Sequence, residues 1–235
     1  SSWRFAGHLT NIPLYYEFEE RGITEQPSEI TGEYLNYYKN VWDLYINNST
    51  AAKNELAAKT ADEAEAEFAE GRAVFFQNGD WEYAAVSELG DENLTMLPIY
   101  IGAEGEEKQG LAIGTENFYA INKNATEAEQ KAAADFIWWL YSSDEGKAYV
   151  TDRLGFIAPF DTFKEDELPR DPLAREVVRY MNDTSVTTVP WIFTSFPSDV
   201  FKAEVGGALL EYVQGGKDWK AVDQTIKDKW KSERA

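Results

Sequence analysis

The chain has 235 residues, of which 43% are hydrophobic, and this is enough apolar material for one or two domains with a hydrophobic core. Its 42 acidic and 22 basic residues give a formal net charge of −20, which argues against nucleic-acid binding because no basic surface would meet the phosphates. The absence of cysteine excludes disulfide bonds and thiolate catalysis, and the single histidine, His8, argues against histidine-based catalytic or metal sites. No run of about 18 apolar residues is present. We expect neither a cofactor nor a bound metal.

The amino-terminal part of the chain is predicted to contain two helices. The first covers residues 13–18, with Asn11 as a candidate N-cap and Gly22 as a candidate stop signal. The second covers residues 28–47, because apolar residues recur there at intervals of three and four. The aromatic side chains of this second helix are expected to serve packing.

The functional prediction depends on the stretch that ends at Trp81. A short helix with a capping-box sequence, Thr60–Glu63, comes first, and an apolar run of strand length follows at residues 73–76. A turn breaks this run, and a new helix is predicted to begin at once with Asp80 as its N-cap. Trp81 would therefore lie beside the carboxyl end of a strand, where open α/β sheets bind ligands. A flat apolar ring among short polar groups such as Asn78 and Asp80 suits a sugar, whose C–H face is apolar and whose rim carries hydroxyls.

Two segments of the chain are similar to a known family. The sequence of residues 68–81, FAEGRAVFFQNGDW, resembles a segment of the extracellular solute-binding proteins of carbohydrate ABC importers, the family 1 group that includes maltose-binding protein. Residues 136–146 resemble a characteristic helix pair of the same family. In that family the tryptophan of the first segment commonly stacks on the bound sugar, so the resemblance implies that Trp81 contacts the ligand. From the residues alone, the alternative is an aromatic side chain that packs at a strand–helix junction.

The fold implied by this resemblance is α/β. It is the helix-rich second lobe of a periplasmic-binding-protein-like (type II) fold with a small mixed sheet. Besides residues 73–76, strands are expected at residues 94–100 and within residues 111–122. Glu116 and Asn117 would either contact the ligand or end a strand.

The resemblance also implies how the chain is divided. Residues 1–101 and 158–235 correspond to the second, C-terminal lobe. Residues 102–157 begin with a glycine-rich linker and would contain the hinge crossing, together with a strand and a helix pair that belong to the first lobe in the family. Most of the first lobe, with a secretion signal or lipid anchor, is then expected upstream of Ser1.

Two other segments supply candidate ligand contacts. The residues before the first helix resemble a second-lobe segment that contributes polar and aromatic sugar contacts, which makes His8 and Asn11 candidates. The alternatives are a simple helix cap and an ordinary half-buried histidine. Residues 184–196 are predicted to be irregular or extended, and the equivalent loop of the family often brings an aromatic side chain to the ligand. Trp191 is therefore a candidate with Phe193 behind it, and the alternative is a hydrophobic plug beneath a loop.

Five further helices are predicted from N-cap signals and from apolar periodicity. They cover residues 132–141, 143–154, 172–182, 199–213 and 219–231. Their candidate cap or capping-box residues include Thr126, Asp171 and Asp218. No internal repeat, low-complexity tract or coiled coil is visible in the sequence.

The function implied by the resemblance is that of a binding protein rather than an enzyme. The chain would bind a sugar or oligosaccharide in an interlobe cleft outside the cell, at the cell surface or in the periplasm, and deliver it to the permease of an ABC transporter. It would meet the membrane only through an anchor upstream. Two other classes stay open: a secreted glycoside hydrolase that uses paired carboxylates, and a non-catalytic protein-interaction domain. No serine-hydrolase, zinc-protease or nucleotide-binding motif is present, and no carboxylate pair stands out among the 42 acids.

Overall fold

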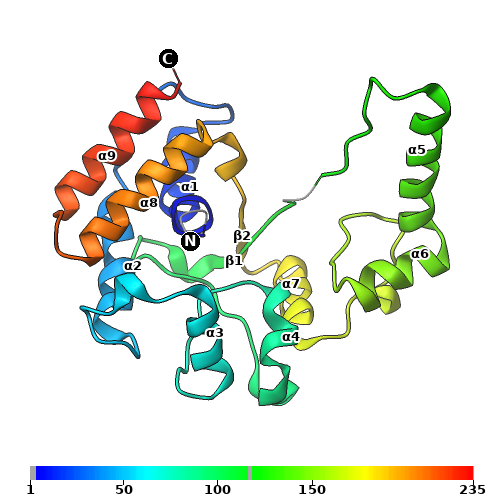
Figure 1. The fold of residues 1–235 in the computed structure, drawn as a ribbon, viewed down its shortest axis with the longest axis horizontal. Coiled ribbons are helices and arrows are strands. Elements are labelled where there is room, and N and C mark those ends of the chain that lie inside the picture. Colours follow the sequence, from blue (N-terminus) through cyan, green and yellow to red (C-terminus); the bar gives the residue numbers. More distant parts are fainter. Residues whose placement is uncertain (1–3, 116–117, 235) are drawn as a thin grey trace. The chain divides into compact units, whose positions relative to one another are not determined.

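The computed structural model of the protein describes residues 4–115 and 118–234, and the chain divides into two compact units. The first unit comprises Ser1–Phe76, Pro98–Gly114 and Ser185–Ala235, and the second comprises Gln77–Leu97 and Thr115–Thr184. Figure 1 shows the elements of both units in the colours of the sequence. These bounds differ from those of the expected lobes, and the division into lobes stays a prediction.

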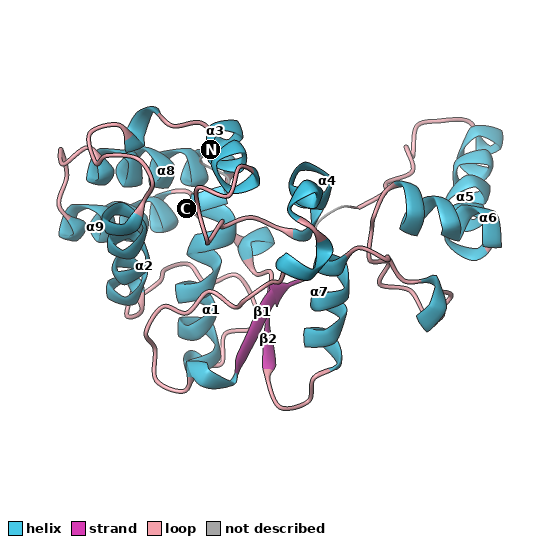
Figure 2. Ribbon diagram, turned by 90° about the horizontal axis from the view of Figure 1, so that it is seen from below, coloured by secondary structure: helices cyan, strands magenta, loops and turns pink. Residues whose placement is uncertain are grey.

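The first unit consists mainly of helices, most of which share one hydrophobic core. Its α-helices are α1 (Thr10–Arg21), α2 (Leu35–Asn48), α3 (Ala61–Ala69), α8 (Asp199–Val213) and α9 (Trp219–Ser232). A π-helix, Arg4–Leu9, leads directly into α1, and short 3₁₀ turns cover Leu56–Ala58, Glu106–Lys108 and Phe193–Ser195. The helices α8 and α9 lie side by side (Figures 1 and 2). The largest fully buried side chains of this core include Leu9, Tyr38, Phe201, Ile226 and Trp230.

Two predictions for the beginning of the chain need correction. Helix α1 begins at Thr10, so Asn11 lies inside the helix and is not its N-cap. Gly22 does end the helix, as predicted: it adopts the left-handed conformation with φ of 60°, and its N–H donates to the carbonyl of Glu19. Helix α2 begins only at Leu35, not at residue 28.

The late start of α2 has a physical cause in the buried carboxylate of Glu17. This carboxylate accepts hydrogen bonds from the N–H groups of Thr31 and Gly32 at 2.7 and 2.8 Å, and it pairs with Arg21 at 2.5 Å. Gly32 has a φ of 74°, which favours glycine and interrupts a helix. The backbone before α2 is therefore bound in a turn on α1, although its apolar spacing is helical.

The sheet of the first unit consists of two strands, β1 (Gln109–Ile113) and β2 (Thr187–Pro190), in the described part of the chain. They pair in parallel, with Ile113 opposite Pro190, so the expected mixed sheet is wrong for the described residues. The two strands end at the same edge (Figure 2).

Most of the predicted strands do not form. Residues 73–76 and 94–100 are irregular, and the strand expected within residues 111–122 ends at Ile113. Residues 116 and 117 of that range, the candidate contacts Glu116 and Asn117, lie outside the described residues. Val74 and Phe75 are 84% and 80% exposed. An apolar run becomes a strand only when a neighbouring strand accepts its backbone hydrogen bonds, and the described residues supply none here.

The second unit contains α4 (Tyr83–Val86), α5 (Glu127–Ser142), α6 (Asp144–Ala148) and α7 (Pro172–Asn182). A π-helix covers Tyr149–Arg153, and 3₁₀ turns cover Asp80–Glu82, Ser87–Leu89, Asp91–Asn93 and Glu165–Glu167. The predicted caps of α5 and α7 are confirmed, because each cap side chain accepts a hydrogen bond from a backbone N–H in the first turn of its helix. Ser143 caps α6 in the same way. Asp80 is not an N-cap, since Gly79 precedes the 3₁₀ turn and Asp80 is its first residue.

A buried ion pair holds part of the second unit together. The ammonium of Lys147 on α6 lies 2.6 Å from the carboxylate of Glu167 and donates to the carbonyl of Thr162 at 3.1 Å.

Helix α5 leaves large apolar side chains in solvent, among them Trp138, which is 70% exposed. Within the described ranges, we find no helix that combines the length and the apolar character required to span a membrane.

Candidate functional site

Three aromatic side chains of the first unit form one contact group. The ring centroid of His8 lies 4.9 Å from that of Trp191 and 4.7 Å from that of Phe193, and the centroids of Trp191 and Phe193 are 5.5 Å apart. All three side chains are half-buried. We call these three residues the aromatic cluster. The rings meet at tilted or near-perpendicular angles, an arrangement that aromatic pairs prefer to direct face-to-face stacking.

The aromatic cluster lies where the two parallel strands end. Trp191 directly follows β2, and Gly114 directly follows β1. The indole ring of Trp191 covers the backbone of Gly114 so closely that a Cβ at position 114 would lie 2.7 Å from its Cδ1 atom. The edge beyond the carboxyl ends of parallel strands is the usual place for ligands in α/β proteins. This relationship was predicted for Trp81, but among the described residues it is found at Trp191.

Asn11 connects helix α1 to the segment that carries Trp191 and Phe193. Its Nδ2 atom donates to the carbonyl of Pro190 at 2.9 Å. Its Oδ1 atom accepts from the N–H groups of Ile192 and Phe193 at 2.6 and 3.0 Å. The side chain has no exposed surface. The buried amide of Asn11 therefore makes hydrogen bonds to three backbone groups of this segment.

The other end of the same loop is bound to the last turn of the chain. The guanidinium of Arg234 donates to the carbonyl of Ser195 and lies over the ring of Trp230, 5.5 Å from its centroid. The hydroxyl of Ser198 donates to the carboxylate of Glu233 at 2.7 Å. The loop that follows β2 is thus tied to α1 at its start and to the residues after α9 at its end.

The second unit contains the other three predicted residues, which are neighbours in sequence. Trp81 is 51% exposed and its Nε1 atom donates to the carboxylate of Glu82 at 3.1 Å. The indole ring bends back over Gly79, where a Cβ would lie 2.2 Å from Cζ3. Asn78 and Asp80 are half-buried, and the Oδ1 atom of Asn78 accepts from the N–H of Gly79 at 3.0 Å. The expected position at a sheet edge is wrong for Trp81 within the described residues, because the run before it forms no strand.

The structure thus brings together four of the predicted site residues, His8, Asn11, Trp191 and Phe193, and it places Asn78, Asp80 and Trp81 in the other unit. Sequence reasoning missed Gly114, which the indole of Trp191 requires to be a glycine. The available signal was a glycine immediately after an apolar strand, which often marks a close approach of another group to the backbone.

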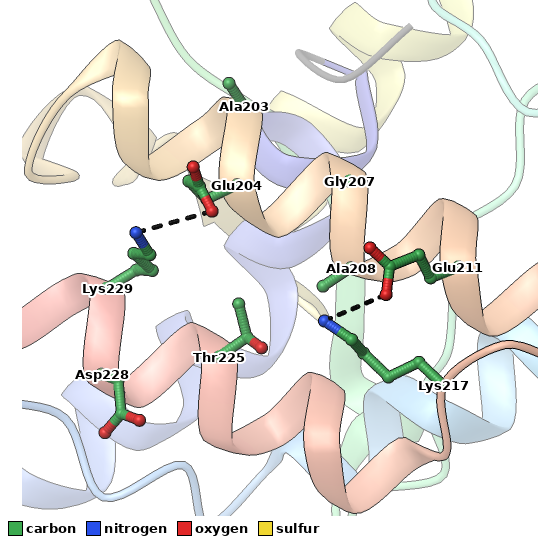
Figure 3. Close-up of a pocket in the computed structure, with 9 residues that line it drawn as sticks. All are labelled: Ala203, Glu204, Gly207, Ala208, Glu211, Lys217, Thr225, Asp228 and Lys229. Carbon is green, nitrogen blue, oxygen red and sulfur yellow. Dashed lines mark ion pairs between the residues drawn. The ribbon is translucent and has the colours of Figure 1, made fainter.

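A groove lies between α8 and α9, with a volume of about 370 Å³ (Figure 3). Ion pairs cross it: Glu204 lies 3.5 Å from Lys229, and Glu211 lies 3.4 Å from Lys217. None of the predicted site residues lines it, and it contains no aromatic side chain. Because its charged groups pair with each other, we assign no ligand to this groove.

No group of acidic and histidine side chains in residues 4–115 and 118–234 is arranged to hold a metal ion. Among the described residues for which contacts are given, the imidazole of His8 belongs to the aromatic cluster and the buried amide of Asn11 lies beneath it. The aromatic rings of the cluster can pack against the apolar face of a ligand.

Comparison with known proteins identifies a family. A family model described as bacterial extracellular solute-binding protein matches residues 21–176. Comparisons with curated proteins and with solved structures find no match. The matched range includes both similar segments, residues 68–81 and 136–146, and it spans more than half of the chain. The protein therefore belongs to the bacterial extracellular solute-binding protein family.

Proposed function

We propose that the protein is the substrate-binding component of an ABC importer and that its substrate is a sugar or an oligosaccharide. The observation that carries this proposal is the aromatic cluster of His8, Trp191 and Phe193 at the carboxyl ends of β1 and β2. The C–H face of a pyranose ring is apolar and packs on aromatic rings, which gains burial without a charged partner. The half-buried state of all three rings leaves part of their surface open for such a contact.

In this proposal Trp81 provides a second aromatic surface, with Asn78 and Asp80 as partners for sugar hydroxyls. The indole of Trp81 is 51% exposed, so part of its surface is open for contact with a sugar. Carboxylate and carboxamide groups suit hydroxyls, since they accept hydrogen bonds and the carboxamide also donates them.

Delivery completes the proposal. The protein acts outside the cell, at the cell surface or in the periplasm, where it passes the bound sugar to the membrane permease of the transporter. Closure around the sugar would exclude water and create the form that the permease recognises. In this proposal an anchor would hold the protein at the membrane.

Calorimetry with a panel of mono- and oligosaccharides tests this function. A protein that carries both lobes of the family fold is expected to bind at least one of them, and Trp191→Ala is expected to abolish that binding. The matched control is Trp138→Ala, which removes an indole that is 70% exposed on α5. Chromatography of the same mixtures checks for cleavage: hydrolysis of any sugar would favour a glycoside hydrolase, and absence of binding across the panel would refute the proposed substrate class.

A further inference from the structure

We infer that Asn11 is the positioning residue of the aromatic cluster: its buried amide holds the backbone of residues 190–193 so that Trp191 and Phe193 present their rings to the ligand. The inference rests on the proposed function. It differs from direct ligand contact by Asn11, because the side chain has no exposed surface.

The hydrogen bonds of Asn11 match the requirements of the loop. Strand β2 ends at Pro190, and its carbonyl receives the Nδ2 donor at 2.9 Å. The N–H groups of Ile192 and Phe193, two and three residues after Pro190, both donate to Oδ1 at 2.6 and 3.0 Å. Where the chain leaves β2 for the 3₁₀ turn Phe193–Ser195, its backbone groups have no strand partner. The side chain of Asn11 supplies their hydrogen bonds instead.

A carboxamide is well suited to this position. It carries no charge, its NH₂ group provides the donor for the carbonyl of Pro190, and its oxygen accepts two hydrogen bonds. An aspartate would keep the acceptor but bring a buried charge against the carbonyl of Pro190, and an alanine would leave all three backbone groups without this partner. Because Trp191 and Phe193 lie on either side of Ile192, the same amide sets the direction of both rings.

The consequence for binding is preorganisation. A loop that is already in its binding conformation loses less freedom when a ligand arrives. Loss of this hold is expected to reduce sugar affinity by about tenfold to a hundredfold, the range that a misplaced binding group produces.

The test compares Asn11→Ala and Asn11→Asp with Thr10→Val. Thr10 precedes Asn11 on α1, is equally buried, and its hydroxyl donates to the carbonyl of Phe5 at 2.7 Å, so its replacement disturbs the same helix without removing the amide. The first measurement needs no ligand: amide hydrogen exchange at Ile192 and Phe193 by nuclear magnetic resonance. Asn11→Ala is expected to accelerate exchange at these two amides selectively, Asn11→Asp less so, and Thr10→Val not at all.

The second measurement is the affinity for whichever sugar of the panel the unmodified protein binds, in the Asn11→Ala variant with and without Trp191→Phe. The phenylalanine keeps an aromatic ring at position 191, which leaves residual affinity to measure. If Asn11 acts through the ring at position 191, Asn11→Ala will reduce the affinity less in a protein that already carries Trp191→Phe than in one that does not. A full and additive loss in the double variant would mean that Asn11 acts independently of the ring at position 191 and would overturn the inference.

The two proposals fail in different ways. If the amides of Ile192 and Phe193 exchange at the same rates in Asn11→Ala as in Thr10→Val, the positioning role of Asn11 is wrong. Sugar binding by the unmodified protein would still support the proposed function. If exchange at these two amides is faster in Asn11→Ala only, but no sugar binds to the unmodified protein, Asn11 does position the loop and the proposed substrate class is wrong.

Discussion

The indole ring of Trp191 lies against the backbone of Gly114, and these two residues are the first to follow the two paired strands. The contact is possible only because position 114 lacks a side chain. Parallel pairing of β1 and β2 makes both strands end at one edge, and the pair Gly114–Trp191 then closes the sheet there with an aromatic ring. The position of the proposed sugar surface thus depends on a glycine from one strand and an indole from the other.

Replacing Gly114 by alanine is expected to displace Trp191. The new Cβ would lie 2.7 Å from Cδ1 and 3.0 Å from Cγ of the indole, which is closer than real atoms pack, so the ring must move. The cost of such overpacking is about 1–3 kcal/mol. Urea unfolding measures the loss of stability, and calorimetry with the sugar panel measures a loss of affinity.

The control for this variant is Gly207→Ala on α8. A Cβ at position 207 meets nothing within 4 Å, and the residue lies in the middle of a helix, where alanine is about 1 kcal/mol more favourable than glycine. This variant is expected to be more stable than the unmodified protein and to keep its sugar affinity. If Gly114→Ala also keeps its stability and its sugar affinity, the indole of Trp191 can accommodate a side chain at position 114 and the prediction is wrong.

Trp81→Ala is expected to weaken sugar binding with little effect on folding. The ring is 51% exposed, so its removal creates no core cavity, and the loss of stability is expected to stay within about 1 kcal/mol. Thermal unfolding and calorimetry on the same sample separate the two effects. Trp138→Ala serves again as the exposed indole outside the proposed site. Global unfolding of Trp81→Ala would mean that the indole serves packing.

The helices with local caps were predictable from the sequence. Thr60, Thr126, Asp171 and Asp218 each accept a hydrogen bond from a backbone N–H within three residues, so their signals need no knowledge of the rest of the fold. Glu17 shows the limit of this reasoning. Its carboxylate reaches across fourteen and fifteen residues to bind the turn before α2, and it overrides a helical pattern of apolar residues.

The strands and the site depend on partners that are distant in sequence. Residues 73–76 have the composition of a strand but no neighbour among the described residues, whereas Thr187–Pro190 forms one because Gln109–Ile113 lies beside it. The resemblance to the family, and no local pattern, named His8, Trp191 and Phe193 as candidates. Their assembly depends on an amide that bonds across 179 residues and on a glycine in another strand, and no local pattern reveals either contact.

Glu17→Ala is expected to destabilise the first unit by about 2 kcal/mol or more, because it leaves the N–H groups of Thr31 and Gly32 without their acceptor. Arg21, the ion-pair partner of the buried Glu17 carboxylate, is itself exposed, so loss of the pair adds little. Glu17→Gln keeps an acceptor oxygen and is expected to lose less. Urea unfolding followed by circular dichroism gives the free energies. The control is Lys231→Ala, which removes an exposed pair with Glu29 and is expected to cost no more than about 1 kcal/mol.

Glu67 is expected to make the stability of the first unit sensitive to acid. A hydrogen bond from the Thr50 hydroxyl, together with the nearby ammonium of Lys59, lowers the pKa of the Glu67 carboxyl below its ordinary value of 4.5. A group whose pKa is lower in the folded state stabilises that state above the unfolded pKa, and this contribution disappears as the pH falls through the folded pKa.

The measurement compares the melting temperatures of the unmodified protein and Glu67→Gln from about pH 7 down to about pH 3. Protonation of the many other carboxylates relieves the repulsion of a chain with net charge −20 and shifts both proteins alike, so the difference between them isolates Glu67. Glu67→Gln is expected to melt lower at neutral pH and to approach the unmodified protein as the pH falls below 4.5. A difference that stays constant into acid would mean that the Glu67 side chain stabilises the fold through packing, since packing does not depend on the protonation of a carboxylate.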